Sequence, residues 1–154
     1  MKIAVFGQYY QNNTAEIVTK VVDFLSANNV SIYFEAAFLK IIQEKNIVDK
    51  SFPSYSNYEE LTTDFEALIS IGGDGTTLKA ATFIRDKNIP IIGINAGRLG
   101  FLATVQFENI ETLLQKVLAK EYCISKRSLL SITTTPEYEN FSVLDFALNE
   151  VTVA

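Results

Sequence analysis

Residues 69–81 read ISIGGDGTTLKAA, where a short apolar run meets a glycine-rich turn and a helical pattern follows at once. Glycine permits backbone conformations closed to other residues and lets a ligand approach the main chain closely. A loop that leads into a helix also presents the free N–H groups of the helix start, which suit an anion such as phosphate. The stretch therefore predicts an anion-binding loop between a buried strand and a helix.

Asp74 lies in the middle of this loop, where its carboxylate would repel a phosphate. One interpretation is that Asp74 accepts a proton from a hydroxyl group or helps to hold a cation bound to phosphate. A phosphoryl-transfer site needs such a group beside a phosphate cradle. The alternative is structural, with Asp74 as the N-cap that accepts the N–H of Thr76 or Thr77. Spacing alone leaves both interpretations open.

The chain up to residue 120 alternates strand and helix patterns. This rhythm predicts an α/β fold, with a Rossmann-like, open, mainly parallel sheet and helices on both faces. In such sheets ligands bind at the carboxyl ends of the strands, where two glycine loops fall. The expected strands are 2–6, 30–34, 67–71 and 90–94, the expected helices are 14–27, 38–45, 76–85 and 107–120, and the glycine loops are 72–75 and 95–100.

The pattern changes after Tyr122, because residues 129–135 and 142–154 are β-patterned with no helix between them. Strands that follow each other in this way are of the antiparallel sort. We therefore divide the chain into an α/β domain over residues 1–121 and the start of a β-rich second domain over residues 122–154. The sequence stops within the last predicted strand, so we expect a fragment whose second domain is truncated.

Residues 47–58 contain Pro53 and several Ser, Asn and Asp residues, which predicts a loop. A plain surface loop and a lid near the site are both compatible with this composition.

The composition limits the available chemistry. The chain has one cysteine, Cys123, and no histidine, which excludes an internal disulfide, a cysteine metal cluster and imidazole acid–base chemistry. We expect Cys123 to be a small buried hydrophobic residue. The net charge of −5 argues against a nucleic-acid-binding face, and no apolar run is long enough to cross a bilayer. These features predict a cytoplasmic protein.

Three motifs together resemble one enzyme family. Residues 71–78, IGGDGTTL, resemble the signature of the NAD kinase family, whereas diacylglycerol and sphingosine kinases and phosphofructokinases share only the GGDG core. Residues 93–102, GINAGRLGFL, are similar to the family's G-x-N-x-G-x-L-G-F-L loop, and Asn149-Glu150 is similar to its N-E pair. The resemblance implies an N-terminal α/β domain and a C-terminal β-rich domain with the site between them.

The same resemblance implies a reaction. NAD kinases move the γ-phosphoryl group of ATP, or of polyphosphate in some members, to the 2′-hydroxyl of the NAD adenosine ribose and so make NADP. A divalent cation such as Mg²⁺ would accompany ATP, held mainly by the nucleotide phosphates and water. The implied partners are small nucleotides, with no nucleic acid and no membrane, in a homo-oligomer (dimer or tetramer) of the full-length protein. We expect the 154-residue chain alone to have little or no kinase activity.

The resemblance also implies roles for the glycine loop. Asp74 would be the catalytic base that takes the 2′-hydroxyl proton from bound NAD. Gly75 would let the dinucleotide approach the main chain, and Gly72 and Gly73 would face the phosphates of ATP.

Five more residues are implied on the NAD side, each with a simpler alternative. Lys79 could add charge to a phosphate or be a solvated helix lysine. Asn95 could touch ligand or fix the second loop by side-chain-to-backbone bonds. Phe101 could line the NAD pocket or belong to the core. Asn149 and Glu150 would hydrogen-bond the adenosine part, or form a polar pair at a strand edge.

Two other functions remain open at this stage. A lipid kinase related to the diacylglycerol or sphingosine kinases would share the GGDG core, but the second loop and the N-E pair argue against it. A non-catalytic nucleotide-binding module would gain little from a carboxylate beside phosphates, so the presence of Asp74 argues against a pure binder.

Overall fold

The computed structural model of the chain describes residues 1–9, 12–49, 51–97, 100–131 and 146–148. The chain divides into two compact units, Met1–Tyr122 and Cys123–Ala154. In chain order, the first unit contains β1 (Lys2–Gly7), α1 (Asn12–Ala27), β2 (Ser31–Glu35), α2 (Ala36–Glu44), β3 (Ser54–Tyr55), β4 (Phe65–Gly72), α3 (Asp74–Ile84), β5 (Ile91–Asn95), the 3-10 turn η1 (Phe107–Asn109) and α4 (Ile110–Ala119).

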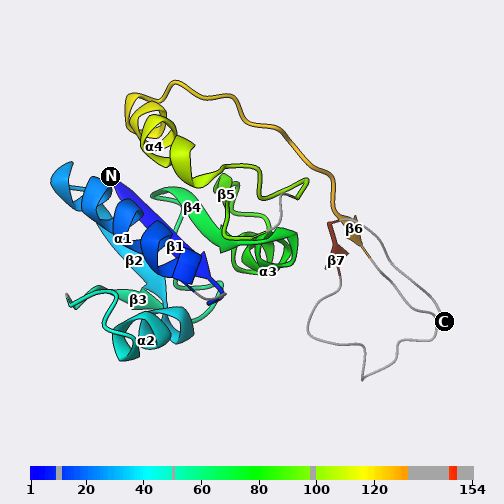
Figure 1. The fold of residues 1–154 in the computed structure, drawn as a ribbon. Helices are drawn as coiled ribbons and strands as arrows, with labels where there is room; N and C mark the ends of the chain where they lie inside the picture. The colour runs from blue at the N-terminus through cyan, green and yellow to red at the C-terminus, as the bar shows by residue number, and fades with distance from the viewer. Residues whose placement is uncertain (10–11, 50, 98–99, 132–145, 149–154) are drawn as a thin grey trace. The chain divides into compact units, whose positions relative to one another are not determined.

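The strands of this unit form a parallel sheet in the order β3-β2-β1-β4-β5 (Figure 1). The prediction of a mainly parallel α/β sheet is therefore confirmed. The strand order reverses between β1 and β4, because β2 and β3 extend the sheet on one side of β1 and β5 extends it on the other. Ligands bind at such a reversal, outside the carboxyl ends of the strands. Gly7 and Gly72 end the two strands at this point.

Side chains of alternate residues in β1 enter two separate cores. Ile3 and Val5 pack with buried residues of α1, α2 and α4, whereas Ala4 and Phe6 pack with buried residues of α3. This alternation follows from the two-residue period of a strand. Helices thus cover both faces of the sheet, as the sequence predicts.

Two helices begin earlier than the apolar spacing indicates. α1 begins at Asn12, which places Thr14 inside the helix as a buried residue rather than as its cap. α3 begins at Asp74, two residues before the expected start at Thr76. Hydrophobic periodicity marks the buried stripe of a helix, so it misses a first turn made of polar residues and glycine.

The segment predicted as a loop over residues 47–58 contains the edge strand β3. Ser54 pairs with Phe34 of β2 and Tyr55 pairs with Glu35. The Tyr55 side chain is 1% exposed, and its hydroxyl donates a hydrogen bond of 3.2 Å to the Val5 carbonyl oxygen. The prediction of a loop is wrong at these two residues, which belong to the sheet and form no lid. A two-residue strand is too short to show an alternating pattern.

The second unit contains β6 (Leu130–Ser131), which pairs antiparallel with β7 (Phe146–Ala147). The predicted change to antiparallel strands is confirmed for these residues, while most of the expected strands over 129–135 and 142–154 lie outside the described part of the chain. Cys123 is exposed, so the prediction that it is buried is wrong. Residues 121–131 are exposed throughout and provide no core for it.

Two aromatic residues offer a test of the sheet edge. Replacement of the buried Tyr55 by alanine removes a ring that packs 5.6 Å from the Phe83 ring, so we expect the free energy of unfolding to fall by about 3–5 kcal/mol. Phe101→Ala is the control, since the Phe101 side chain is 92% exposed and its loss should cost less than about 0.5 kcal/mol. Urea unfolding followed by circular dichroism measures both, and an equal loss in the two variants would contradict the assignment of β3.

Candidate active site

The turn from β4 into α3 is capped by the main chain. The Gly73 carbonyl oxygen accepts the N–H groups of Thr76 and Thr77, at 3.0 and 3.1 Å. Gly73 is the N-cap residue and Asp74 is the first residue of the helix. The interpretation of Asp74 as an N-cap side chain is therefore wrong, and its carboxylate has other partners.

The Asp74 carboxylate accepts three main-chain hydrogen bonds from the loop that follows β5. Its Oδ2 atom accepts the N–H of Phe101 at 2.8 Å, and its Oδ1 atom accepts those of Leu102 and Ala103 at 2.9 and 3.0 Å. We call this arrangement, the Asp74 carboxylate and the N–H groups of residues 101–103, the clasp. The clasp joins the two glycine loops that the sequence places at the carboxyl ends of β4 and β5.

The clasp changes the acidity of Asp74. Hydrogen bonds from the main chain of Ala103, Phe101 and Leu102 hold the pKa of the Asp74 carboxyl below its usual value, against a smaller opposing effect of desolvation. The side chain is half-buried, so it also has access to solvent. Asp74 is therefore ionised at neutral pH and is a weaker base than an ordinary carboxylate.

Three glycines are required by the packing around the clasp. A Cβ atom at Gly100 would overlap the Asp74 carboxylate, and one at Gly72 would overlap the Thr76 side chain. At Gly93, a Cβ atom would lie 2.6 Å from the Leu102 carbonyl oxygen and 2.7 Å from the Ala103 Cα atom. Distances this short do not occur in folded proteins, so these positions exclude larger residues.

Three other glycines are not required by the fold that is described. A Cβ atom at Gly73, Gly75 or Gly97 would meet nothing within 4 Å. Gly73 also has an extended backbone, with φ −102° and ψ −168°, which other residues adopt. At the helix start, Gly73 and Gly75 therefore suit the close approach of a ligand, whereas the Gly97 N–H is already bound by the Asn95 side chain.

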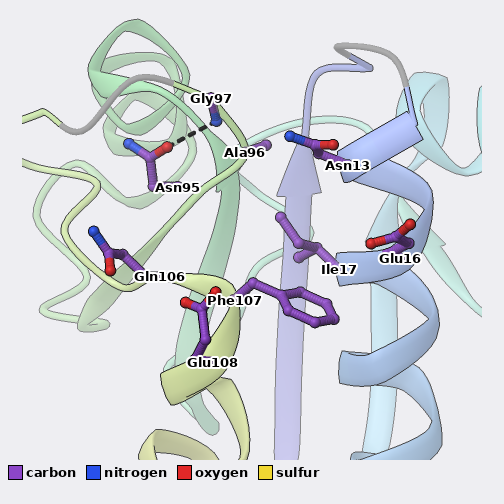
Figure 2. Close-up of a pocket in the computed structure, with 9 residues that line it drawn as sticks. All are labelled: Asn13, Glu16, Ile17, Asn95, Ala96, Gly97, Gln106, Phe107 and Glu108. Atoms are coloured by element: carbon purple, nitrogen blue, oxygen red, sulfur yellow. Dashed lines mark hydrogen bonds between the residues drawn. The ribbon is translucent and has the colours of Figure 1, made fainter.

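Asn95 anchors the second loop from the sheet side. Its buried side chain accepts the N–H of Gly97 at 2.7 Å and donates to the Ala103 carbonyl oxygen at 3.2 Å (Figure 2 shows the bond to Gly97). Asn95 also lies beside Gly72 in the register of β4 and β5. The side-chain-to-backbone bonds that the sequence analysis offers for Asn95 are thus present, and they hold both ends of the loop close to the glycine turn.

A hollow of about 450 Å³ lies beside this loop, on the face of the sheet covered by α1 and α4. Figure 2 shows Asn13, Glu16 and Ile17 of α1 on one side of it and Gln106 and Glu108 on the other. The remaining lining residues are Asn95, Ala96, Gly97 and Phe107. Asp74 and Gly75 do not line it, so the hollow adjoins the clasp through the 95–97 segment without containing the carboxylate.

The other predicted site residues have different surroundings. Lys79 is exposed on α3, with its Nζ atom 5.9 Å from the centroid of the Phe6 ring. Phe101 is 92% exposed, which excludes the alternative that it belongs to the core. Asn149 and Glu150 lie outside the described residues.

The part of the chain that is described holds no group of three or more His, Cys, Asp or Glu side chains that could bind a metal ion. In the same part, no helix has the length and apolar character required to cross a membrane.

Comparison with known proteins identifies the family. Residues 3–122 match the family model described as the ATP-NAD kinase N-terminal domain. The chain belongs to the NAD kinase family. Membership decides against the lipid-kinase alternative.

Relatives of the NAD kinase family match along the whole chain. The NAD kinase of Flavobacterium psychrophilum is 52% identical over 154 residues, which are all of this chain and 52% of that protein. The NAD kinase of Methanothermobacter thermautotrophicus is 37% identical over 153 residues, 98% of this chain and 48% of that protein. The chain thus spans about half the length of the curated relatives it matches.

Solved structures of NAD kinases share the fold. The crystal structure of yeast NADH kinase complexed with NADH has a TM-score of 0.68 at 18% identity, covering 85% of this chain and 41% of that one. An NAD kinase from Archaeoglobus fulgidus in complex with ATP has a TM-score of 0.52 at 25% identity, covering 78% and 38%.

Sequence reasoning missed the partners of Asp74. The motif of residues 93–102 contained the signal, since Gly100 stands directly before the N–H groups that bind the carboxylate. No rule of spacing connects Asp74 with main-chain groups 27–29 residues further along the chain.

Asp74→Asn tests the clasp on the 154-residue chain. The amide has one acceptor oxygen and no charge, so we expect the amide hydrogens of residues 101–103 to exchange about tenfold faster at pH 7. Asp86→Asn is the control, because the Asp86 carboxylate accepts a bond from the Tyr58 hydroxyl and none from this loop. NMR hydrogen exchange measures both variants, and unchanged protection in Asp74→Asn would contradict the clasp.

The stability that the clasp contributes depends on pH, and the direction of this dependence follows from the sign of the pKa shift. The pKa of the Asp74 carboxyl is lower in the folded state than its ordinary value of 3.8. The clasp therefore stabilises the fold fully above that ordinary value and loses its effect as the pH falls through the lowered folded pKa. The stability difference between wild type and Asp74→Asn should accordingly be constant from neutral pH down to about pH 5 and shrink below pH 4.

Proposed function

We propose that this chain is the N-terminal half of an NAD kinase that transfers the γ-phosphoryl group of ATP to the 2′-hydroxyl of the NAD adenosine ribose and makes NADP. The observation that carries the proposal is the Asp74 carboxylate, which main-chain donors hold beside the open start of a helix. It lies at the carboxyl ends of the strands, where ligands bind in sheets of this kind. Full-length relatives named NAD kinase and the structures that contain NADH or ATP support the same assignment.

The start of α3 provides the phosphate side of the site. The N–H groups of Gly73, Asp74 and Gly75 belong to the cap and first turn, so they have no acceptor within the helix. Gly75 is exposed, and neither Gly73 nor Gly75 has a neighbour where a Cβ atom would be. The ATP phosphates approach the main chain at Gly73, and the dinucleotide approaches it at Gly75. Gly72 would also face the ATP phosphates, and its missing side chain lets the turn close on Thr76.

Asp74 provides the acceptor for the hydroxyl proton. A carboxylate offers about four acceptor positions, two on each oxygen. The clasp uses two on Oδ1 and one on Oδ2, which leaves one position on Oδ2 for the 2′-hydroxyl of the ribose. The ribose oxygen forms a bond to the γ-phosphorus as the bond to the bridging oxygen of ADP breaks, and that bridging oxygen keeps the electron pair. The hydroxyl proton passes to Oδ2 and then to water.

The remaining assignments concern NAD binding. Lys79 supplies positive charge near the phosphates from the second turn of α3, and Phe101 offers an exposed ring beside the clasp. Asn95 acts through the loop it anchors. Asn149 and Glu150 would hydrogen-bond the adenosine.

The described residues do not fit a Mg²⁺ site of the protein's own. They contain no metal-binding cluster, and Asp74 has a main-chain partner on each oxygen. We therefore assign no step to the cation, which would arrive on the phosphates of ATP. The cytoplasmic location and the dimeric or tetrameric state of the full-length protein stay predictions.

Asp74→Asn in the full-length protein tests the proposal. Wild type should convert NAD⁺ to NADP⁺ in the presence of ATP, and the variant should lower kcat by about 10²–10⁴-fold, the loss expected for a proton acceptor. Asp86→Asn should leave kcat within about twofold, since Asp86 lies beyond the C-terminal end of α3, where its carboxylate accepts the Tyr58 hydroxyl. A coupled assay of NADP⁺ measures all three proteins. Near-normal turnover of Asp74→Asn, or no NADP⁺ from wild type, would refute the proposal.

A further inference from the structure

We propose that Gly100 is a positioning residue for the reaction, because with the main chain of residues 101–103 it sets the one orientation of the Asp74 carboxylate that leaves Oδ2 open to the ribose hydroxyl. The inference rests on the proposed function and adds to it a residue that touches neither substrate.

The contact between Gly100 and Asp74 leaves no room for a side chain. A Cβ atom on Gly100 would overlap Oδ1 and lie 2.5 Å from Cγ and 2.7 Å from Oδ2 of Asp74. Each of these three atoms would thus be closer to the new Cβ atom than van der Waals contact allows. A substitution at Gly100 must therefore displace either the carboxylate or the loop.

Contacts on the sheet side hold the loop just after Gly100 and so oppose a movement away from the carboxylate. The Ala103 carbonyl oxygen is bound by the Asn95 side chain at 3.2 Å. On the sheet side, the Cα atom of Gly93 packs so closely on Leu102 and Ala103 that no Cβ atom fits between them. Residues 102–103 are thus held between β5 and the carboxylate, and we infer that the side chain of Asp74 is the part that rotates.

Rotation of the carboxylate would change both its direction and its acidity. In the clasp, Oδ1 has two main-chain donors and Oδ2 has one, so the two oxygens are not equivalent. The same bonds lower the pKa of the Asp74 carboxyl, which makes it an acceptor that aligns the hydroxyl before it takes the proton. The proton moves only as the ribose oxygen bonds to phosphorus, because the hydroxyl becomes strongly acidic at that moment. A carboxylate released from the clasp would have a higher pKa and no fixed direction.

Gly100→Ala tests the inference in the full-length protein, with Gly97→Ala as the matched control. Gly97 is in the same loop, and a Cβ atom there meets nothing within 4 Å. We expect Gly100→Ala to lower kcat/KM for NAD⁺ by about 10²-fold, the usual loss when a reacting group moves by an ångström. The acid limb of its pH profile should also move to higher pH, since the loss of main-chain bonds raises the pKa of Asp74. Gly97→Ala should keep wild-type kcat/KM within about twofold and the same acid limb.

A second measurement is independent of activity. In the 154-residue chain, ¹³C NMR of the Asp74 carboxyl should show a higher pKa in Gly100→Ala than in wild type and Gly97→Ala. If Gly100→Ala unfolds, the double variant Asp74→Ala/Gly100→Ala should be as stable in urea as Asp74→Ala alone, because the group that overlaps the new Cβ atom is gone.

The outcomes separate the two proposals. An unchanged Asp74 titration in Gly100→Ala, a lower kcat/KM with an unmoved acid limb, or a double variant less stable than Asp74→Ala alone would overturn the positioning role. A displaced titration together with no NADP⁺ formation by wild type would support the positioning of the carboxylate and refute the proposed function alone.

Discussion

The Asp74 carboxylate, bound by three main-chain N–H groups of residues 101–103, is the interaction on which the arrangement of the site depends. Hydrogen bonds to an ionised acceptor are shorter and stronger than those between neutral groups. The three bonds to Asp74 join the turn at the end of β4 to the loop that begins at the end of β5. Without them, the described part of the second loop would keep the bonds of the Asn95 side chain and the bond from the Ala96 N–H to the Gly72 carbonyl oxygen, and the carboxylate would have no defined direction. One side chain thus organises the loop, and in the proposed function the same side chain accepts the ribose proton.

The parallel sheet makes this contact possible. β4 and β5 are paired neighbours, so their last residues, Gly72 and Asn95, lie side by side. The two loops that follow therefore begin at the same end of the sheet. The glycines then divide by what surrounds them. Gly72, Gly93 and Gly100 have no space for a side chain, and their identity is explained by packing. Gly73, Gly75 and Gly97 face open space, and packing gives no reason for them. A nucleotide approaching the helix start would explain Gly73 and Gly75.

Much of the fold is predictable from the sequence because it depends on periodic burial. The apolar runs at 67–71 and 90–94 are strands, and the helical spacing up to residue 120 marks helices on both faces. Three features depend on contacts between distant parts of the chain, and the sequence does not show them. Tyr55 becomes a strand residue through its place beside Glu35, Cys123 is exposed because no core reaches it, and the partners of Asp74 are backbone groups, which no residue type signals. The motif around Asp74 is recognisable in the sequence, whereas its hydrogen bonds form only when the chain folds.

The most direct test is a crystal structure of the full-length protein with NAD⁺ bound. We expect Oδ2 of Asp74 to lie within hydrogen-bonding distance of the adenosine ribose 2′-hydroxyl, about 2.5–3.0 Å. We also expect Oδ1 to keep the N–H groups of Leu102 and Ala103 in that complex. A ribose placed elsewhere, with the carboxylate still enclosed by the loop and out of reach of any substrate hydroxyl, would show that Asp74 is not the proton acceptor.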